Sequence, residues 1–317
     1  MIVLGIDIGG KSFKCAVVRD DGSILEQTAF LPDYSKGQDF CLSHFLDQIE
    51  GWLSSLSLPQ SLAGIGIGCP GLIDSELGIC KYSNNLGWRD LPLSKIFEQR
   101  FGLPCYITND ANAAMAGEMR FGSYRYDNAI LLTLGTGVGG GIFLDGKLFE
   151  GVGGMGAELG HTVLVKGGNL CTCGRRGCFE TYASATALET EAERRLPNHP
   201  ESALNDGKIT AKAVFVAAKA GDKLAKELLD WYIENLGEGI INLINVFRPS
   251  AILLGGGVSK AGDDLLLPLK SYLEKEHYGY AREYGNPIAV EIASLSNDAG
   301  VLGAAALVFA KKKIIFR

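Results

Sequence analysis

Short apolar segments that end in glycine alternate along the chain with longer segments of helical periodicity. The apolar segments predict strands at 2–8, 13–19, 24–29, 63–68, 105–108, 129–134, 140–144 and 251–254. The periodic segments predict helices at 40–56, 93–101, 110–118, 241–246 and 299–310, and mostly helix at 186–236. Strands that alternate with helices are typical of an α/β protein.

One order of elements occurs twice. A strand, a glycine turn, a second strand and an Asp-Gly turn fill residues 2–22 and recur at 129–146. We interpret this as an internal duplication of an α/β unit that begins with a β-hairpin, which would place two glycine turns across a cleft from each other. Two unrelated hairpins are the alternative.

Length and composition limit the class of protein. A chain of 317 residues suggests about two domains, and 47% hydrophobic with 21% charged residues is typical of a globular fold with a large core. The net charge of -6 argues against a broad nucleic-acid or membrane surface. The start MIVLGIDIGG lacks the pattern of a secretory signal. We therefore expect a cytoplasmic protein without a nucleic-acid or membrane partner.

Glycine is the unusual component, with 42 residues, about twice the average share. Clusters occur at the predicted strand ends, at 9–10, 64–71, 135–141, 151–160, 167–177 and 255–257. Glycine allows a backbone to adopt positive φ or to approach a ligand closely. This distribution predicts a site assembled from several strand ends.

A cysteine motif gives the most specific local signal. Cys171, Cys173 and Cys178 form a C-x-C-x4-C loop, and His161 precedes it by ten residues. Zinc prefers four nitrogen or sulfur ligands, so this Cys3His set predicts a closed, structural zinc site. A disulfide, which the expected compartment disfavours, and chance clustering are the alternatives.

The segment Gly135-Thr136-Gly137-Val138-Gly139-Gly140 contains a G-x-G-x-x-G string. A dinucleotide-binding motif would continue into a helix, whereas here a second strand is predicted. The turn of such a hairpin can still hold phosphate with its backbone amides. A tight turn without a ligand is the alternative.

Two acidic positions stand at predicted strand ends. Asp7 precedes Gly9 and Gly10, where a carboxylate could hold Mg²⁺ beside a phosphate, or simply cap a turn. Asn109 and Asp110 stand where a strand passes into a helix. They are either an ordinary N-cap or a general base at the carboxyl end of a strand.

Three further polar residues flank the cysteine loop, namely Glu158, His161 and Glu180. A metal in that loop would hold both flanking segments and fix the geometry of their side chains. Solvated carboxylates without a function are the alternative.

Taken together, these motifs resemble the ROK (repressor, open reading frame, kinase) family of sugar kinases. The resemblance covers nearly the whole chain, through LGIDIGG, GIGCPGLID, SNNLGW, ITNDANAA, LGTGVGGGIFLDGKLFEGVGGMGAELGH, CTCGRRGCFETYAS and LLGGGVS. It implies a duplicated actin-like (ribonuclease-H-like) ATPase fold with two lobes around a central cleft. The implied lobes are 1–112 with 296–317, and 113–295 with the zinc loop. A homodimer is also implied.

The resemblance further implies ATP-dependent phosphorylation of a hexose, with glucose at its 6-hydroxyl as the leading substrate and Asp110 as the base. The implied sugar ligands are Asn85, Asn109, Asp110, Glu158, His161 and Glu180. The implied contacts to ATP and Mg²⁺ are Asp7, Gly9, Gly10, Gly135, Thr136, Gly137, Gly255, Gly256 and Gly257. The implied zinc ligands are His161, Cys171, Cys173 and Cys178, so His161 would bind zinc with one ring nitrogen and sugar with the other.

Alternatives within the resemblance are a kinase for N-acetylmannosamine, fructose, allose or a β-glucoside, and a sugar-responsive regulator without turnover. The intact Asp110 and the glycine turns argue against the regulator, as does a start directly at the first strand without a helix-turn-helix. One departure is Lys11, where the family usually has threonine after the two glycines. This lysine could reach the phosphates or point into solvent.

Overall fold

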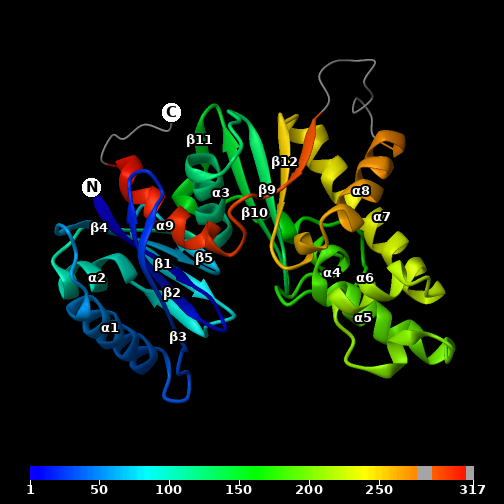
Figure 1. Ribbon diagram of the computed structural model, residues 1–317, viewed down its shortest axis with the longest axis horizontal. Coiled ribbons are helices and arrows are strands. Elements are labelled where there is room, and N and C mark those ends of the chain that lie inside the picture. The colour runs from blue at the N-terminus through cyan, green and yellow to red at the C-terminus, as the bar shows by residue number, and fades with distance from the viewer. Residues whose placement is uncertain (277–287, 312–317) are drawn as a thin grey trace. The chain divides into compact units, whose positions relative to one another are not determined.

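The computed structural model describes residues 1–276 and 288–311 (Figure 1). Packing divides the chain into two compact units. The first unit comprises Met1–Asp127, Gly141–Ala157 and the segment from Ser294, and the second comprises Asn128–Gly140 and Glu158–Ala293. These packing units are cut differently from the lobes that the resemblance implies, and those lobes stay a prediction. Positions 277–287 and 312–317 of the predicted lobes lie outside the described residues.

The first unit contains a five-stranded sheet in the order β3-β2-β1-β4-β8. The strands are β1 (Ile2–Ile8), β2 (Phe13–Arg19), β3 (Ile24–Phe30), β4 (Leu62–Cys69) and β8 (Cys105–Asn109). The first three are antiparallel, and the last two run parallel to β1. One side of this sheet packs on helices α1 (Gln38–Ser55) and α2 (Leu93–Phe101), and the other on α9 (Ala299–Lys311). Alternating side chains along β1 supply both cores.

Helix α9 approaches its sheet closely because glycine faces it. A Cβ at Gly5 would lie 2.3 Å from the carbonyl oxygen of Val301, so no larger residue fits there without a backbone shift. Helix α3 (Asp110–Phe121) packs on α9. The fully buried Glu118 of α3 accepts hydrogen bonds from the backbone N–H groups of Ser294, at 3.1 Å, and Leu295, at 2.7 Å. The helix that begins at Asp110 is therefore held along its length.

The second sheet has the order β11-β10-β9-β12-β13. Its strands are β9 (Ala129–Leu134), β10 (Val138–Leu144), β11 (Lys147–Phe149), β12 (Ala251–Gly255) and β13 (Ala289–Ile292). As in the first sheet, three consecutive strands are followed by two later ones that run parallel to the innermost of the three. This repeated connectivity confirms the predicted duplication. The boundary between the two units lies inside β10, after Gly140.

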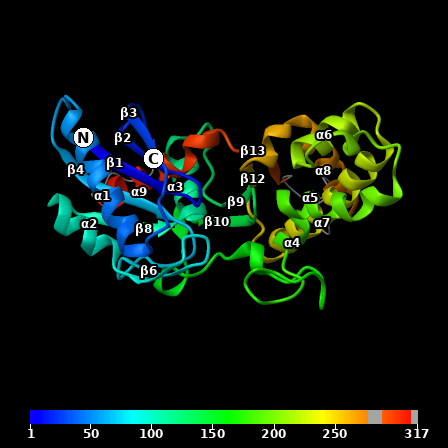
Figure 2. The same ribbon diagram turned by 90° about the horizontal axis from the view of Figure 1, so that it is seen from below.

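The second unit also contains a group of helices (Figure 2). They are α4 (Glu180–Ala183), α5 (Ala185–Arg195), α6 (Ala211–Lys219), α7 (Lys223–Phe247) and α8 (Asp263–Glu276), and α4, α5, α6 and α8 all pack against α7. The segment predicted as mostly helix at 186–236 is therefore several helices. Thr210 and Asp222 start new ones, because their side chains accept hydrogen bonds from backbone N–H groups of the following turn.

The periodicity missed several short strands and the 14-residue helix α8. These are β5 (Leu72–Asp74), β6 (Ile79–Ser83), β7 (Trp88–Leu91), β11, β13 and α8. Each short strand has too few residues for an alternation to stand out, and α8 contains Pro268, which usually interrupts a helix. Among the described helices, none is long and apolar enough to cross a membrane.

Candidate functional site

Asp110 begins helix α3 immediately after strand β8. Asn109 is the N-cap, since its side-chain oxygen accepts from the N–H groups of Ala111, at 2.9 Å, and Asn112, at 3.4 Å. Its Nδ2 donates to the carbonyl of Gly71 at 3.1 Å. One hydrogen of that amide remains for a ligand such as a sugar hydroxyl. The N-cap is thus Asn109, and the half-buried Asp110 follows it in the first turn, where its Oδ1 also accepts from the Ala111 N–H at 2.9 Å. A carboxylate in this position is chemically suited to accept a proton.

Thr108 and Glu150, which the sequence analysis did not indicate, form a hydrogen bond close to Asp110 in the chain. The hydroxyl of the buried Thr108 donates to the Glu150 carboxylate at 2.5 Å. Glu150 also accepts from the N–H of Gly156 through its carbonyl, at 2.7 Å. The loop after β11 is therefore fastened to the strand that presents Asn109 and Asp110. No local pattern could have identified this pair, because the two residues are 42 positions apart.

The turn between β1 and β2 lies beside two predicted ligand contacts. The N–H of Gly9 donates to the carbonyl of Ser12 at 3.0 Å, and Gly10 is exposed at the tip. A Cβ on Gly10 would have the Cβ of Asn85 as its nearest neighbour, at 3.9 Å. Asn85 is exposed in the loop between β6 and β7. The first unit thus places a glycine turn and a predicted sugar ligand next to each other.

Asp7 lies below this turn, at the end of β1. Its carboxylate contacts the first turn of α9, where a Cβ on Gly300 would lie 2.6 Å from Asp7 Cγ. Burial raises the pKa of Asp7, and Lys14, its partner across the hairpin, opposes that rise. Lys14 also donates to the carbonyl of Asn297 at 3.0 Å. A carboxylate in this position is a suitable oxygen ligand for Mg²⁺.

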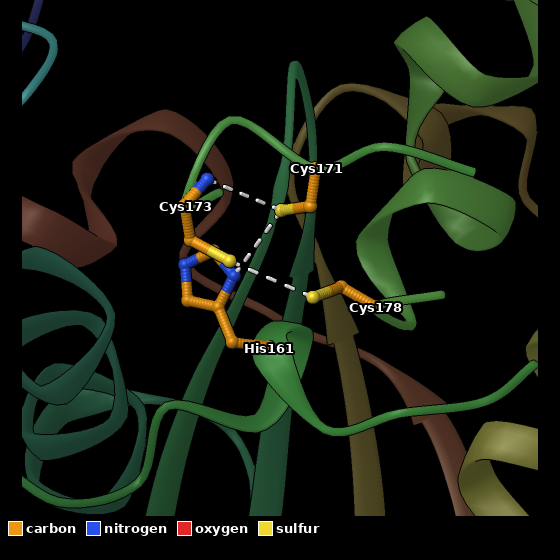
Figure 3. Close-up of side chains that lie close together, drawn as sticks. All are labelled: His161, Cys171, Cys173 and Cys178. Carbon is orange, nitrogen blue, oxygen red and sulfur yellow. Dashed lines mark hydrogen bonds between the residues drawn. The ribbon is translucent and has the colours of Figure 1, made fainter. Parts of the chain in front are cut away.

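In the second unit, His161 and three cysteines converge (Figure 3). Their ligand atoms all lie within 4.8 Å of one another. Cys171 Sγ is 3.6 Å from His161 Nδ1, and Cys173 Sγ is 3.6 Å from Cys178 Sγ. A tetrahedral zinc with bonds of about 2.3 Å needs sulfurs about 3.8 Å apart, so the spacing fits that ion. The geometry uses Nδ1 of the imidazole and leaves Nε2 for another partner.

Glu180 joins this cluster to the glycine turn of β9 and β10. One carboxylate oxygen, Oε1, is 3.0 Å from Cys171 Sγ and 3.7 Å from His161 Nδ1. The other, Oε2, occupies the space beside Gly137, where a Cβ would lie only 2.5 Å away. Desolvation raises the pKa of Glu158, while nearby His161 lowers it and nearby Glu180 raises it, so both residues lie close enough to act on Glu158.

The glycine turn at 135–137 is closed by a hydrogen bond from the Gly135 N–H to the Gly137 carbonyl, at 3.0 Å. The Gly135 carbonyl accepts from the N–H of Ala185 at 2.8 Å, which fastens the turn to the start of α5. Thr136 is exposed at the tip and borders a pocket of about 300 Å³ that Glu180 also lines. This unit therefore places Thr136 of the glycine turn and the carboxylate of Glu180 around one hollow.

The triplet Gly255-Gly256-Gly257 ends β12. Gly256 has φ 83° and lies against the end of β9, where a Cβ would be 2.5 Å from the carbonyl of Leu134. A Cβ on Gly257 would meet nothing within 4 Å, so its backbone is open to a ligand. The three glycines thus lie at the carboxyl end of β12, a parallel strand, and ligands of α/β proteins bind at such strand ends.

The ROK family model matches residues 3–311. The chain belongs to this family, whose solved sugar kinases have the actin-like ATPase fold. A glucokinase of Halalkalibacterium halodurans is 41% identical over 313 residues, which cover 96% of this chain and 94% of that protein. The crystal structure of a Streptomyces griseus ROK glucokinase with glucose and AMPPNP is 35% identical, with a TM-score of 0.82 over 97% of this chain and 99% of that one. A xylose repressor of Caldicellulosiruptor bescii is 31% identical over 96% of this chain and 77% of its own length.

Proposed function

We propose that this protein transfers the terminal phosphoryl group of ATP to the 6-hydroxyl of glucose, with Asp110 as the general base. Full-length similarity to glucokinases makes it an ATP-dependent sugar kinase. The observation that carries the assignment of the base is that Asn109, and not Asp110, is the N-cap of α3. The Asp110 carboxylate, which accepts a hydrogen bond from the Ala111 N–H through Oδ1, follows this cap in the first turn as a group that can accept a proton.

Phosphoryl transfer depends on positioning and charge neutralisation more than on covalent catalysis. Asp110 accepts the proton of the attacking hydroxyl. The backbones of Gly9-Gly10 and of Gly135, Thr136 and Gly137 line the phosphates, and those of Gly255, Gly256 and Gly257 approach the adenosine. Asp7 is the carboxylate that would hold Mg²⁺, and the bound ion would neutralise phosphate charge.

The residues assigned to the sugar are divided between the two units. Asn85, Asn109 and Asp110 belong to the first, and Glu158, His161 and Glu180 belong to the second. All are carboxylate, amide or imidazole groups, which suit a ring of unmodified hydroxyls and offer no fixed cation to a sugar phosphate or a sugar acid. This composition favours an unmodified hexose as acceptor.

We assign a structural zinc to His161, Cys171, Cys173 and Cys178, whose spacing suits it. The ion would complete a closed tetrahedral shell and hold two chain segments together. His161 then keeps Nε2 for a sugar hydroxyl, and Glu180 is placed by its contact with Cys171. A homodimer, implied by the family resemblance, and a cytoplasmic location, expected from the sequence, complete the proposal.

A coupled assay of ADP release across a panel of sugars tests the substrate. We expect the highest kcat/KM for glucose, with mannose or glucosamine weaker, because a site built to bond a hydroxyl discriminates strongly against analogues that lack it. A higher kcat/KM for N-acetylmannosamine or fructose would retain the kinase and reject glucose.

A sugar-responsive regulator is the second candidate, favoured by the likeness to a xylose repressor. The same assay separates the two functions. A regulator binds a sugar in calorimetry but releases no ADP when ATP and Mg²⁺ are supplied.

A further inference from the structure

Lys11 is a cation that the proposed mechanism leaves without a role. β1 and β2 are joined by the four residues Gly9–Ser12, since Ile8 and Phe13 are the last pair of their register. The bond from Gly9 N–H to the Ser12 carbonyl closes the turn and leaves Gly10 and Lys11 exposed at its tip. The lysine therefore sits on the same turn that is assigned to the phosphates.

The two lysines of this hairpin, Lys11 and Lys14, differ in the partners of their ammonium groups. Lys14 lies opposite Asp7 in the register and donates to the carbonyl of Asn297, so it has a structural partner. Lys11 forms no ion pair with any residue of the described ranges 1–276 and 288–311. Its ammonium group is therefore available to an external anion.

We infer that Lys11 binds the phosphate chain of the nucleotide and contributes to the affinity for the phosphoryl donor. This inference rests on the proposed function, because it takes the glycine turn as a phosphate site. The Gly9 amide is bonded to the Ser12 carbonyl, so the Gly10 amide is the fixed, uncharged donor of this turn, and Asp7 at the end of β1 adds negative charge nearby. A flexible side chain with three donors and a full positive charge offsets part of that repulsion.

A threonine at this position would offer one hydroxyl and no charge. The two side chains therefore predict different behaviour. With lysine, part of the affinity for nucleotide is an interaction between charges, so it should weaken as salt is added. With threonine, the hydrogen bond can remain while this dependence on salt declines.

Calorimetric titration of ADP into the full chain tests the inference, at low and high salt. Lys11→Met should raise the Kd for ADP about tenfold or more, as expected when a hydrogen bond to a charged group is lost. The Kd for glucose should stay within about twofold. Lys11→Thr should recover part of the affinity for ADP but have a smaller salt dependence than wild type. Lys147→Met, at an exposed lysine in β11 of the same unit, is the matched loss of charge and should change neither constant.

Two results would overturn the inference in distinguishable ways. If wild type binds ADP and Lys11→Met binds it within twofold of wild type, Lys11 has no role while the kinase assignment stands. If wild type binds no ADP, the phosphate site and the proposed function both fail. A Lys11→Met protein that binds glucose normally and melts at the wild-type temperature rules out misfolding as the cause of weaker ADP binding.

Discussion

The two sheets share one connectivity, but different functional residues follow their last strands. In the first, strand β8 passes directly into α3, and Asn109 and Asp110 stand at that junction. In the second, β13 occupies the matching place in the order of strands and is followed by the segment that leads to α9. The proton acceptor therefore arises in only one copy of the duplicated unit. The second copy instead carries an insertion, with the cysteine loop, between its hairpin and β12.

The glycine turns of the two hairpins show the same divergence. Gly10 is open, with the nearest atom to an added Cβ at 3.9 Å, and it is followed by a lysine. Gly137 is closed on one side by the Glu180 carboxylate, 2.5 Å from the same added atom. A shared backbone motif can thus serve a ligand with a free cation in one copy and with a fixed carboxylate in the other. Each prediction below alters one copy and leaves the other intact.

The largest effect is expected in the first copy, at Asp110. Asp110→Asn keeps the size and the hydrogen-bonding capacity of the side chain but removes its ability to accept a proton. We expect kcat to fall by roughly 10²–10⁴-fold, the contribution typical of a general base, with the Kd for glucose nearly unchanged. Steady-state kinetics and calorimetry measure the two quantities.

Asn109→Ala provides the contrast, since it removes the cap and leaves the carboxylate. It should lower stability by about 1 kcal/mol while retaining more turnover than Asp110→Asn. A loss of only a few-fold in kcat for Asp110→Asn would make Asp110 a positioning residue and remove this difference between the copies.

The sequence predicted the strands that are mostly buried. Strands Ile2–Ile8, Phe13–Arg19 and Ala129–Leu134 have the predicted bounds, because most of their side chains are apolar and buried. Helix α2 has them too, because Gly102, with φ 65°, ends it. Strands β5, β6, β7 and β11 were missed, since their pairing is decided by contacts distant in sequence and their short, half-exposed segments lack a pattern.

The candidate site divides in the same way. The spacing of the cysteines and His161 predicted a cluster that the structure brings together, because a metal-binding loop is a local motif. The brace between Thr108 and Glu150, and the position of Glu180 beside Gly137, depend on packing between distant segments. Periodicity and motif spacing contain no information on such pairs. The functional roles of the site residues remain predictions that the variants test.

The second effect concerns the cysteine cluster of the second copy. A strong chelator removes the ion altogether, whereas Cys173→Ser removes one proposed ligand. Because the loss of even a group that only supports a ligand typically weakens metal binding 10–100-fold, we expect at least that loss for Cys173→Ser. By linkage this is about 1.4–2.8 kcal/mol, which lowers the Tm by roughly 3–10 °C. We also expect weaker glucose binding, because Glu180 and His161 would lose their fixed geometry. Differential scanning calorimetry and glucose titration measure these changes.

Thr172→Ala is the control for this loop, because Thr172 is exposed between two of the cysteines and is not a proposed ligand. It should leave both the Tm and the glucose affinity close to wild type. Metal analysis that finds no zinc in freshly purified protein would reject the site. Equal losses in Thr172→Ala and Cys173→Ser would make the loop itself, rather than the metal, responsible.

The smallest effect is expected from adding one methyl group to each glycine turn. Neither Gly10 nor Gly137 has a φ in the left-handed region, so alanine is compatible with both backbones. In Gly137→Ala the new Cβ meets Glu180 Oε2 at 2.5 Å and must displace that carboxylate, so the KM for glucose should rise about tenfold or less. In Gly10→Ala the methyl has room, and the KM for glucose should change by less than about twofold. A similar change of the KM for glucose in both variants would show that Glu180 does not make the second turn different from the first. The proposed contrast between an open turn and a turn filled by a carboxylate would then be rejected.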